Sequence, residues 1–314
     1  MTTLVRPRTP EAVGVSTFGE WPAVAGGDGG HRPGLRERRV AEETVRDAAE
    51  ERAGRTVHLG AGVLALSVLA DSALEHYRGS FHNKAMVAPL VSATLSLATN
   101  APATFGARAP LPLLDAVQAA AAATGVAGLG FHAFNIGKRP GGLSWLNLFY
   151  AAPVGAPFAL ALSGFFGRCA VRLAGDSRTL FGWPAGRLLA ATAAGGLIGT
   201  AAEAGLLHFR GAYHNPAMAL PVTIPPVAAG LLAAAALKPA PALRRAARVG
   251  LVATAAVGVA GVGFHLFGVS RNMGGFRNLS QNLLNGPPVP APPSFLGLAL
   301  IGLAALSLME ANDA

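Results

Sequence analysis

Six of the eight histidines in this sequence occupy matched positions in two related segments. Residues 76–86 read HYRGSFHNKAM, and residues 208–218 read HFRGAYHNPAM. A second match follows in the same order, with GFHAF at residues 130–134 and GFHLF at residues 263–267. The chain is therefore an internal duplication in which each copy keeps one acid and three histidines: Asp71, His76, His82 and His132 in the first, and Glu203, His208, His214 and His265 in the second.

Histidines combined with a carboxylate point to ligation of a cofactor. Imidazole is the commonest nitrogen ligand for zinc, copper and iron, and a nearby carboxylate either binds the metal or orients a ring. One hypothesis is a transition-metal site (copper, iron or zinc) that draws on all eight side chains. The other is haem b in each copy, with propionates neutralised by arginine; its ligands would be His76 with His132 and His208 with His265, and its arginines Arg78 and Arg210.

The spacing within each motif sets a condition on both hypotheses. His76 and His82 are six residues apart, so they do not share one face of a continuous helix. They converge only if the chain turns near Gly79, and Gly211 permits the same turn in the second copy. The glycine-rich approach to His132 and His265 either lets a flat macrocycle lie against the helix or serves close helix packing.

Two other functions compete with ligation. A duplicated membrane protein encloses a central path, along which acid and histidine pairs bind ions or relay protons, so a transporter of a metal ion or small solute is the first alternative. The second is a structural membrane subunit whose polar residues only hydrogen-bond the loop ends and lipid headgroups. A polar path through the midplane favours transport, whereas converging histidines without such a path favour ligation.

Composition places these motifs in a membrane. The sequence is 52% hydrophobic and 13% charged, with a mean hydropathy of +0.43, whereas soluble domains carry about 25% charged residues. We predict an all-α integral membrane protein with eight transmembrane helices, arranged as two tandem parallel four-helix repeats that are related by a pseudo-twofold axis along the membrane normal. The predicted spans are residues 57–76, 85–104, 112–135, 147–167, 187–207, 217–237, 248–268 and 293–311.

The domain organisation follows from these spans. Residues 1–56 form a cytoplasmic tail, in which residues 1–35 are disordered and residues 36–55 form a charged helix. Residues 57–186 hold the first repeat with its connecting loop, and residues 187–314 hold the second. Cys169, the only cysteine, is placed in a cytoplasmic loop and excludes a disulfide within the chain.

Lysine and arginine counts set the orientation. The tail and the loops after the even-numbered spans carry 18, and the remaining loops carry 7. The positive-inside rule therefore places both termini in the cytoplasm and the histidines at the outer face of the inner membrane. The partners expected are the lipid bilayer and a redox partner subunit, because no other catalytic group is visible. No nucleic-acid motif is present, so the ligation hypothesis predicts an electron-transfer or oxidoreductase subunit.

Overall fold

The computed structural model describes residues 35–107, 110–175 and 177–313. Residues 1–34, most of the segment predicted to be disordered, lie outside this range. Residues 42–314 form one compact unit. In the described residues the chain forms ten α-helices: α1 (Leu35–Arg78), α2 (Ala88–Thr104), α3 (Leu111–Gly137), α4 (Trp145–Tyr150), α5 (Gly155–Leu173), α6 (Ala185–Arg210), α7 (Leu220–Leu237), α8 (Pro241–Arg271), α9 (Leu279–Asn285) and α10 (Pro293–Asp313).

Short elements join these helices. The strands β1 (Thr179–Leu180) and β2 (Trp183–Pro184) pair antiparallel between α5 and α6. Three short 3-10 helices occur in the described residues: η1 (Lys84–Val87), η2 (Pro216–Ala219) and η3 (Gly275–Asn278). The first two begin alike, because the side-chain oxygens of Asn83 and Asn215 each accept a hydrogen bond from a backbone N–H two residues later, at 2.9 Å.

The all-α prediction is confirmed, and six helices in the described residues are long and apolar enough to cross a membrane. They match six of the eight predicted spans. The two others fall on α2, which has 17 residues, and on α5. The six are Arg46–Arg78, Leu111–Gly137, Ala185–Arg210, Pro216–Leu237, Pro241–Arg271 and Pro293–Asp313.

The prediction for residues 147–167 was wrong in its boundaries. Helix α4 ends at Tyr150 and α5 begins only at Gly155. Pro153 lies in the break, and proline disfavours helical geometry in the residue before it. The shift carries α5 on to Leu173, so Cys169 lies inside this helix with no exposed surface rather than in a loop.

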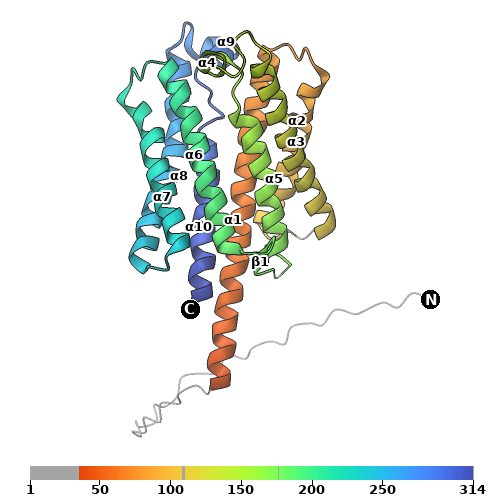
Figure 1. The fold of residues 1–314 in the computed structure, drawn as a ribbon, viewed down its shortest axis with the longest axis vertical. Coiled ribbons are helices and arrows are strands. Elements are labelled where there is room, and N and C mark those ends of the chain that lie inside the picture. The colour runs from red at the N-terminus through yellow and green to blue at the C-terminus, as the bar shows by residue number, and fades with distance from the viewer. Residues whose placement is uncertain (1–34, 108–109, 176, 314) are drawn as a thin grey trace, which may run out of the picture. The chain divides into compact units, whose positions relative to one another are not determined.

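The helices of residues 42–314 run side by side in two groups (Figure 1). Helices α6, α7, α8 and α10 pack together, as do α2, α3 and α5. Helix α1 joins the second group, because the Ser163 hydroxyl on α5 donates to the Ala61 carbonyl on α1 at 2.9 Å. The groups meet where α1 crosses α10. Gly60 on α1 and Gly297 on α10 approach so closely that a Cβ added to Gly297 would lie 2.8 Å from the carbonyl oxygen of Gly60. They also meet where Phe158 on α5 lies against Gly199 on α6.

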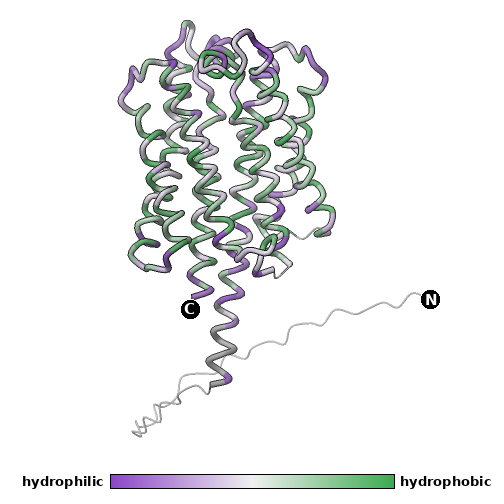
Figure 2. The backbone as a smooth tube through the Cα atoms, viewed as in Figure 1, coloured by the Kyte–Doolittle hydropathy of each residue, from purple (hydrophilic) through white to green (hydrophobic). Residues whose placement is uncertain are grey.

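The two ends of this bundle differ. The short helices α4 and α9 lie at one end, and the β1–β2 hairpin and the end of α10 lie at the other (Figure 1). Polar residues gather at both ends, while the middle of the helices is predominantly apolar (Figure 2). The two histidine turns, residues 76–86 and 208–218, follow α1 and α6 at the end that holds α4 and α9. We call this the histidine end.

Candidate functional site

The two histidine turns have the same hydrogen bond. The Nδ1–H of His76 donates to the carbonyl of Met86 at 2.6 Å, and the Nδ1–H of His208 donates to the carbonyl of Met218 at 2.8 Å. A carbonyl oxygen only accepts, so each bond places the ring proton on Nδ1. The lone pair for a ligand is then on Nε2. A second-shell bond of this kind is what orients metal-ligating imidazoles in proteins.

The turns also share a strained backbone. The helices end and the chain turns at Gly79 and Gly211, as expected, but the left-handed residues are not these glycines. Ser80 (φ 56°) and Phe81 (φ 44°) take that conformation in the first turn, as do Ala212 (φ 54°) and Tyr213 (φ 47°) in the second. Each such residue costs on the order of 1–3 kcal/mol, and this kind of strain concentrates at functional sites.

His82 and His214 follow the strained residues and point elsewhere. Both are exposed, and the Nδ1–H of each donates to the carbonyl of the glycine three residues earlier, at 3.0 Å. His82 and His76 were expected to converge if the chain turned, but His76 bonds the Met86 carbonyl and His82 bonds the Gly79 carbonyl, so the two rings share no hydrogen-bond partner. The two exposed rings belong to the surface of the turns.

His132 in α3 and His265 in α8 lie about one and a half turns before the ends of their helices, Gly137 and Arg271, and both face proline-containing backbone. The Nδ1–H of His265 donates to the carbonyl of Pro288 at 2.7 Å. His132 occupies the matched place beside the backbone of Ala152 and Pro153, although its buried Nδ1 has no well-aligned hydrogen bond. The structure thus gives three of the four span histidines, His76, His208 and His265, a backbone carbonyl at Nδ1.

These four histidines lie in two pairs. His76 and His132 are close enough to interact electrostatically, and so are His208 and His265. They come from α1 and α3 in the first half, and from α6 and α8 in the second. Within the described residues no protein hydrogen bond holds the Nε2 of any of the four. The sequence predicts the same four residues as haem ligands, and that role stays a prediction.

The two acids interact with each other where the two halves meet. Asp71 interacts electrostatically with Glu203 across the halves, and also with Glu75 and Arg78. The backbone N–H of Gly155, the first residue of α5, donates to the Glu203 carboxylate. A carboxylate at a helix N-terminus is favoured by the helix dipole.

The eight predicted donors do not form one cluster. All of them are described, and no three His, Cys, Asp or Glu side chains in the described residues are placed to hold a metal ion. The structure therefore offers two-histidine pairs and a separate pair of acids.

The arginines differ between the halves. Arg78 forms an ion pair with Glu75 at 2.7 Å. Leu207 stands in place of Glu75 in the second half, and Arg210 instead lies 5.1 Å above the ring of Phe149. Phe149 also packs edge-on against Phe209, with ring centroids 5.9 Å apart. Helix α4 of the first half therefore covers the end of α6 in the second.

The glycines before His132 and His265 serve packing. A Cβ at Gly125 would overlap the backbone nitrogen of Ala161 on α5, and one at Gly258 would lie 2.7 Å from that of Leu296 on α10. Both glycines lie seven residues before a histidine, and they bring α3 and α8 close to their neighbours. The helix-packing interpretation accounts for these positions.

Sequence reasoning missed a buried polar network in the first half. The ring Nδ1 of His58 bonds the side-chain oxygen of Asn100 at 2.8 Å, and the Ser96 hydroxyl donates to Gln118 at 2.9 Å. Ser163 bonds Ser96 at 3.1 Å. The aligned residues of the second half are all apolar and buried: Ala190, Ala228, Leu232, Leu251 and Leu298. The signal was the set of polar residues inside the predicted spans, but these residues have no polar match in the second copy.

No protein-family model, curated protein or solved structure matches this chain.

Proposed function

We propose that the protein crosses the inner membrane eight times, as two parallel four-helix repeats, and that both of its termini lie in the cytoplasm. Parity supports the number of spans. His76 and His132 interact electrostatically, and each lies near the C-terminal end of its helix, α1 or α3, so α2 must return the chain to the opposite end. At 1.5 Å per residue its 17 residues span roughly 25 Å. Helix α5 likewise returns the chain to the opposite end before α6 begins.

The function we propose is haem binding by two histidine pairs, for electron transfer at the outer face. One observation carries it: in each half two histidines interact electrostatically, and three of these four rings, those of His76, His208 and His265, donate Nδ1–H to a backbone carbonyl and have no protein hydrogen bond at Nε2 among the described residues. These histidines would hold a b-type haem through Nε2 while the backbone carbonyl at Nδ1 orients the ring, and the haem would supply one-electron transfer. The repetition of the pair in both halves supports two haems rather than one.

Haem fits the arrangement better than a bare metal ion. Structural zinc takes four protein ligands and catalytic zinc three, whereas haem iron needs only one or two from the protein. The described residues bring together pairs and no group of three. Arg78 and Arg210 remain the cations proposed for the propionates, with Arg78 shared with Glu75. A redox partner subunit would supply or accept the electrons.

The test is the absorption spectrum of detergent-purified protein, oxidised and dithionite-reduced, with elemental analysis of the same sample. We expect a Soret band, sharp reduced bands and two irons per chain. His76→Ala or His132→Ala should remove about half of the Soret absorbance, and His76→Ala with His208→Ala should remove nearly all of it.

His82→Ala and His214→Ala are the matched controls, because these rings lie in the same turns but are exposed. Both variants should keep the full spectrum. Loss of haem from a control would contradict the pairing. Stoichiometric metal without a haem spectrum would replace haem by a direct site, and neither haem nor metal in protein expressed with both would reject ligation.

A second candidate is transport of a proton or small cation. It is favoured by the buried network of His58, Asn100 and Gln118, which places polar groups inside the bundle. Uptake by the protein in sealed proteoliposomes, with a pH-sensitive or metal-sensitive dye inside, tests it. Uptake by the wild type that is lost in His58→Ala would favour transport. No uptake by the wild type in vesicles shown to be sealed would reject it.

A further inference from the structure

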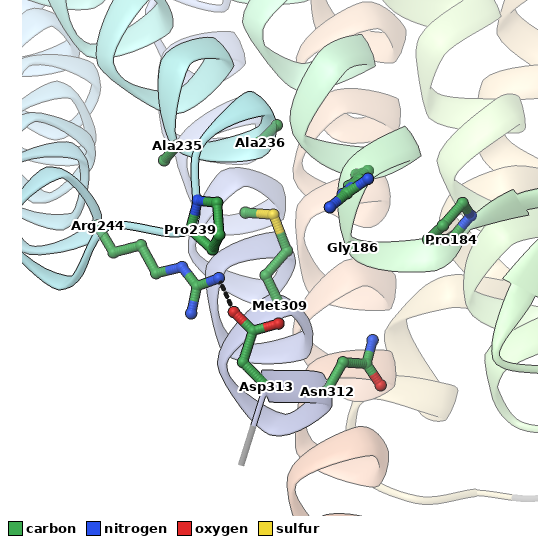
Figure 3. Close-up of a pocket in the computed structure, with 10 residues that line it drawn as sticks. Pro184, Gly186, Ala235, Ala236, Pro239, Arg244, Met309, Asn312 and Asp313 are labelled. Carbon is green, nitrogen blue, oxygen red and sulfur yellow. Dashed lines mark hydrogen bonds and ion pairs between the residues drawn. The ribbon is translucent and has the colours of Figure 1, made fainter.

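A hollow lies at the end of the bundle opposite the histidines. It has a volume of about 230 Å³ and is bounded by the start of α6, the end of α7, the loop before α8 and the end of α10. Figure 3 shows Arg244 and Asp313 at one side of it and Gly186 at the other. A wider hollow adjoins it, shares Arg244 and Asp313, and adds Arg245.

The guanidinium of Arg244, in the wall of this hollow, lacks a hydrogen-bond partner among the described residues for one of its buried N–H groups. Its side chain is only 11% exposed and its Nη2 donates to the Asp313 carboxylate. Its Nε is buried and has no hydrogen-bond partner. Guanidinium presents five N–H donors in a planar fork, which matches the oxygens of a phosphate. An anion with several acceptor oxygens would supply what one carboxylate does not.

Two further arginines line the hollows without a partner. Arg187 borders the first hollow and Arg245 the second. Among the described residues neither has a hydrogen bond or an ion pair. The nearby carboxylates, Glu310 and Asp313, are already paired with Arg248 and Arg244. Positive charge is therefore in excess here.

The walls and the location favour a lipid over a free anion. Apolar side chains, including Ala235, Ala236 and Met309, form much of the lining beside the arginines. Leu237, which ends α7 next to them, is 81% exposed. The hollow lies where helices long and apolar enough to cross a membrane end, which in a bilayer corresponds to the headgroup region. A phosphodiester with an apolar tail matches both parts of the lining.

We propose that this hollow binds the phosphate of an anionic phospholipid, with Arg187, Arg244 and Arg245 as its cationic contacts. The arginines hold the phosphate oxygens, and the alanine and methionine side chains contact the glycerol and the first acyl carbons. The inference is independent of haem, because none of its residues lies at the histidine end.

The experiment measures lipid retention by native mass spectrometry, with the full chain taken from nanodiscs of phosphatidylcholine containing increasing phosphatidylglycerol. Wild type should retain phosphatidylglycerol selectively. Each arginine removed should weaken that retention about fivefold, as expected for a basic residue at a membrane surface. Arg187→Gln with Arg245→Gln tests this without touching an ion pair. Arg139→Gln with Arg277→Gln, at the histidine end, is the matched control and should retain phosphatidylglycerol as wild type does.

Asp313→Asn separates a lipid site from a purely structural ion pair. It frees Arg244, so phosphatidylglycerol should be retained more tightly; weaker retention would overturn the proposal. Equal retention by wild type and the variant with Arg187→Gln and Arg245→Gln would overturn it as well. If inorganic phosphate at millimolar concentration displaces phosphatidylglycerol and stabilises the detergent-solubilised protein equally well, a phosphate site is supported and the lipid as its occupant is rejected.

Discussion

The carboxylate of Glu203 occupies the space that a side chain at Gly155 would need. Glu203 lies on α6 in the second half and Gly155 is the first residue of α5 in the first half. A Cβ at Gly155 would overlap Glu203 Oε2, and the Gly155 N–H donates to the same carboxylate. The opposite crossing exists too, because the Ser67 hydroxyl on α1 donates to the carbonyl of Pro290 at 2.5 Å. The halves are therefore joined through the starts of α5 and α10.

Gly155→Ala should push Glu203 out of its position. We expect a loss of about 1–3 kcal/mol of unfolding free energy, the usual cost of overpacking, measured by thermal unfolding in detergent. Gly195→Ala is the matched control, since a Cβ there meets nothing within 4 Å. It should be neutral or slightly stabilising, because alanine favours helix over glycine.

A double variant isolates the contact. If the clash is with Glu203, adding Glu203→Ala to Gly155→Ala should recover most of the loss, as an interaction energy between neighbours. Additive effects of the two changes would contradict this account.

Asn100→Leu should leave the buried Nδ1 of His58 without a partner. The expected cost is about 1–3 kcal/mol, the penalty for an unsatisfied buried polar group. Combining it with His58→Ala, which copies Ala190 and Leu232 of the second half, should recover much of that cost. The reverse change Leu232→Asn buries a lone amide and should destabilise by a similar amount. Unchanged unfolding temperatures for both single variants would reject the network as a stabilising element.

Cys169 should report the folding of the first half. It is the only cysteine and has no exposed surface, so a thiol-reactive fluorogenic dye should label the protein only on unfolding. Labelling should therefore follow the same thermal transition as circular dichroism. Fast stoichiometric labelling of the native protein would show instead that this part of α5 is accessible.

Phe149→Ala should loosen the end of α6. It removes the ring under Arg210 and the edge contact with Phe209, each interaction contributing about 0.5–1.5 kcal/mol. Hydrogen exchange should rise at residues 208–218. The turn at residues 76–86 is an internal control and should keep its protection. An equal increase in both turns would indicate general destabilisation rather than loss of this cap.

What the sequence by itself determined is local. Apolar runs and proline or glycine boundaries predicted the long helices, and the duplication predicted two equivalent turns. The turns follow from contacts within ten residues, such as His76 with Met86, so similar segments fold alike. The helix after Gly155 was misplaced because the break before it depends on a few residues between two apolar stretches.

Only the tertiary structure decided which residues meet. His76 interacts electrostatically with His132 because α1 and α3 belong to one bundle, and Asp71 interacts with Glu203 because the halves pair. The sequence treated acids and histidines as one set, and packing separated them into pairs. It also brought His58, Asn100 and Gln118 together from three helices. Local hydrogen bonds specify a helix or a turn, whereas side chains far apart in sequence are brought together only by the packing of whole helices.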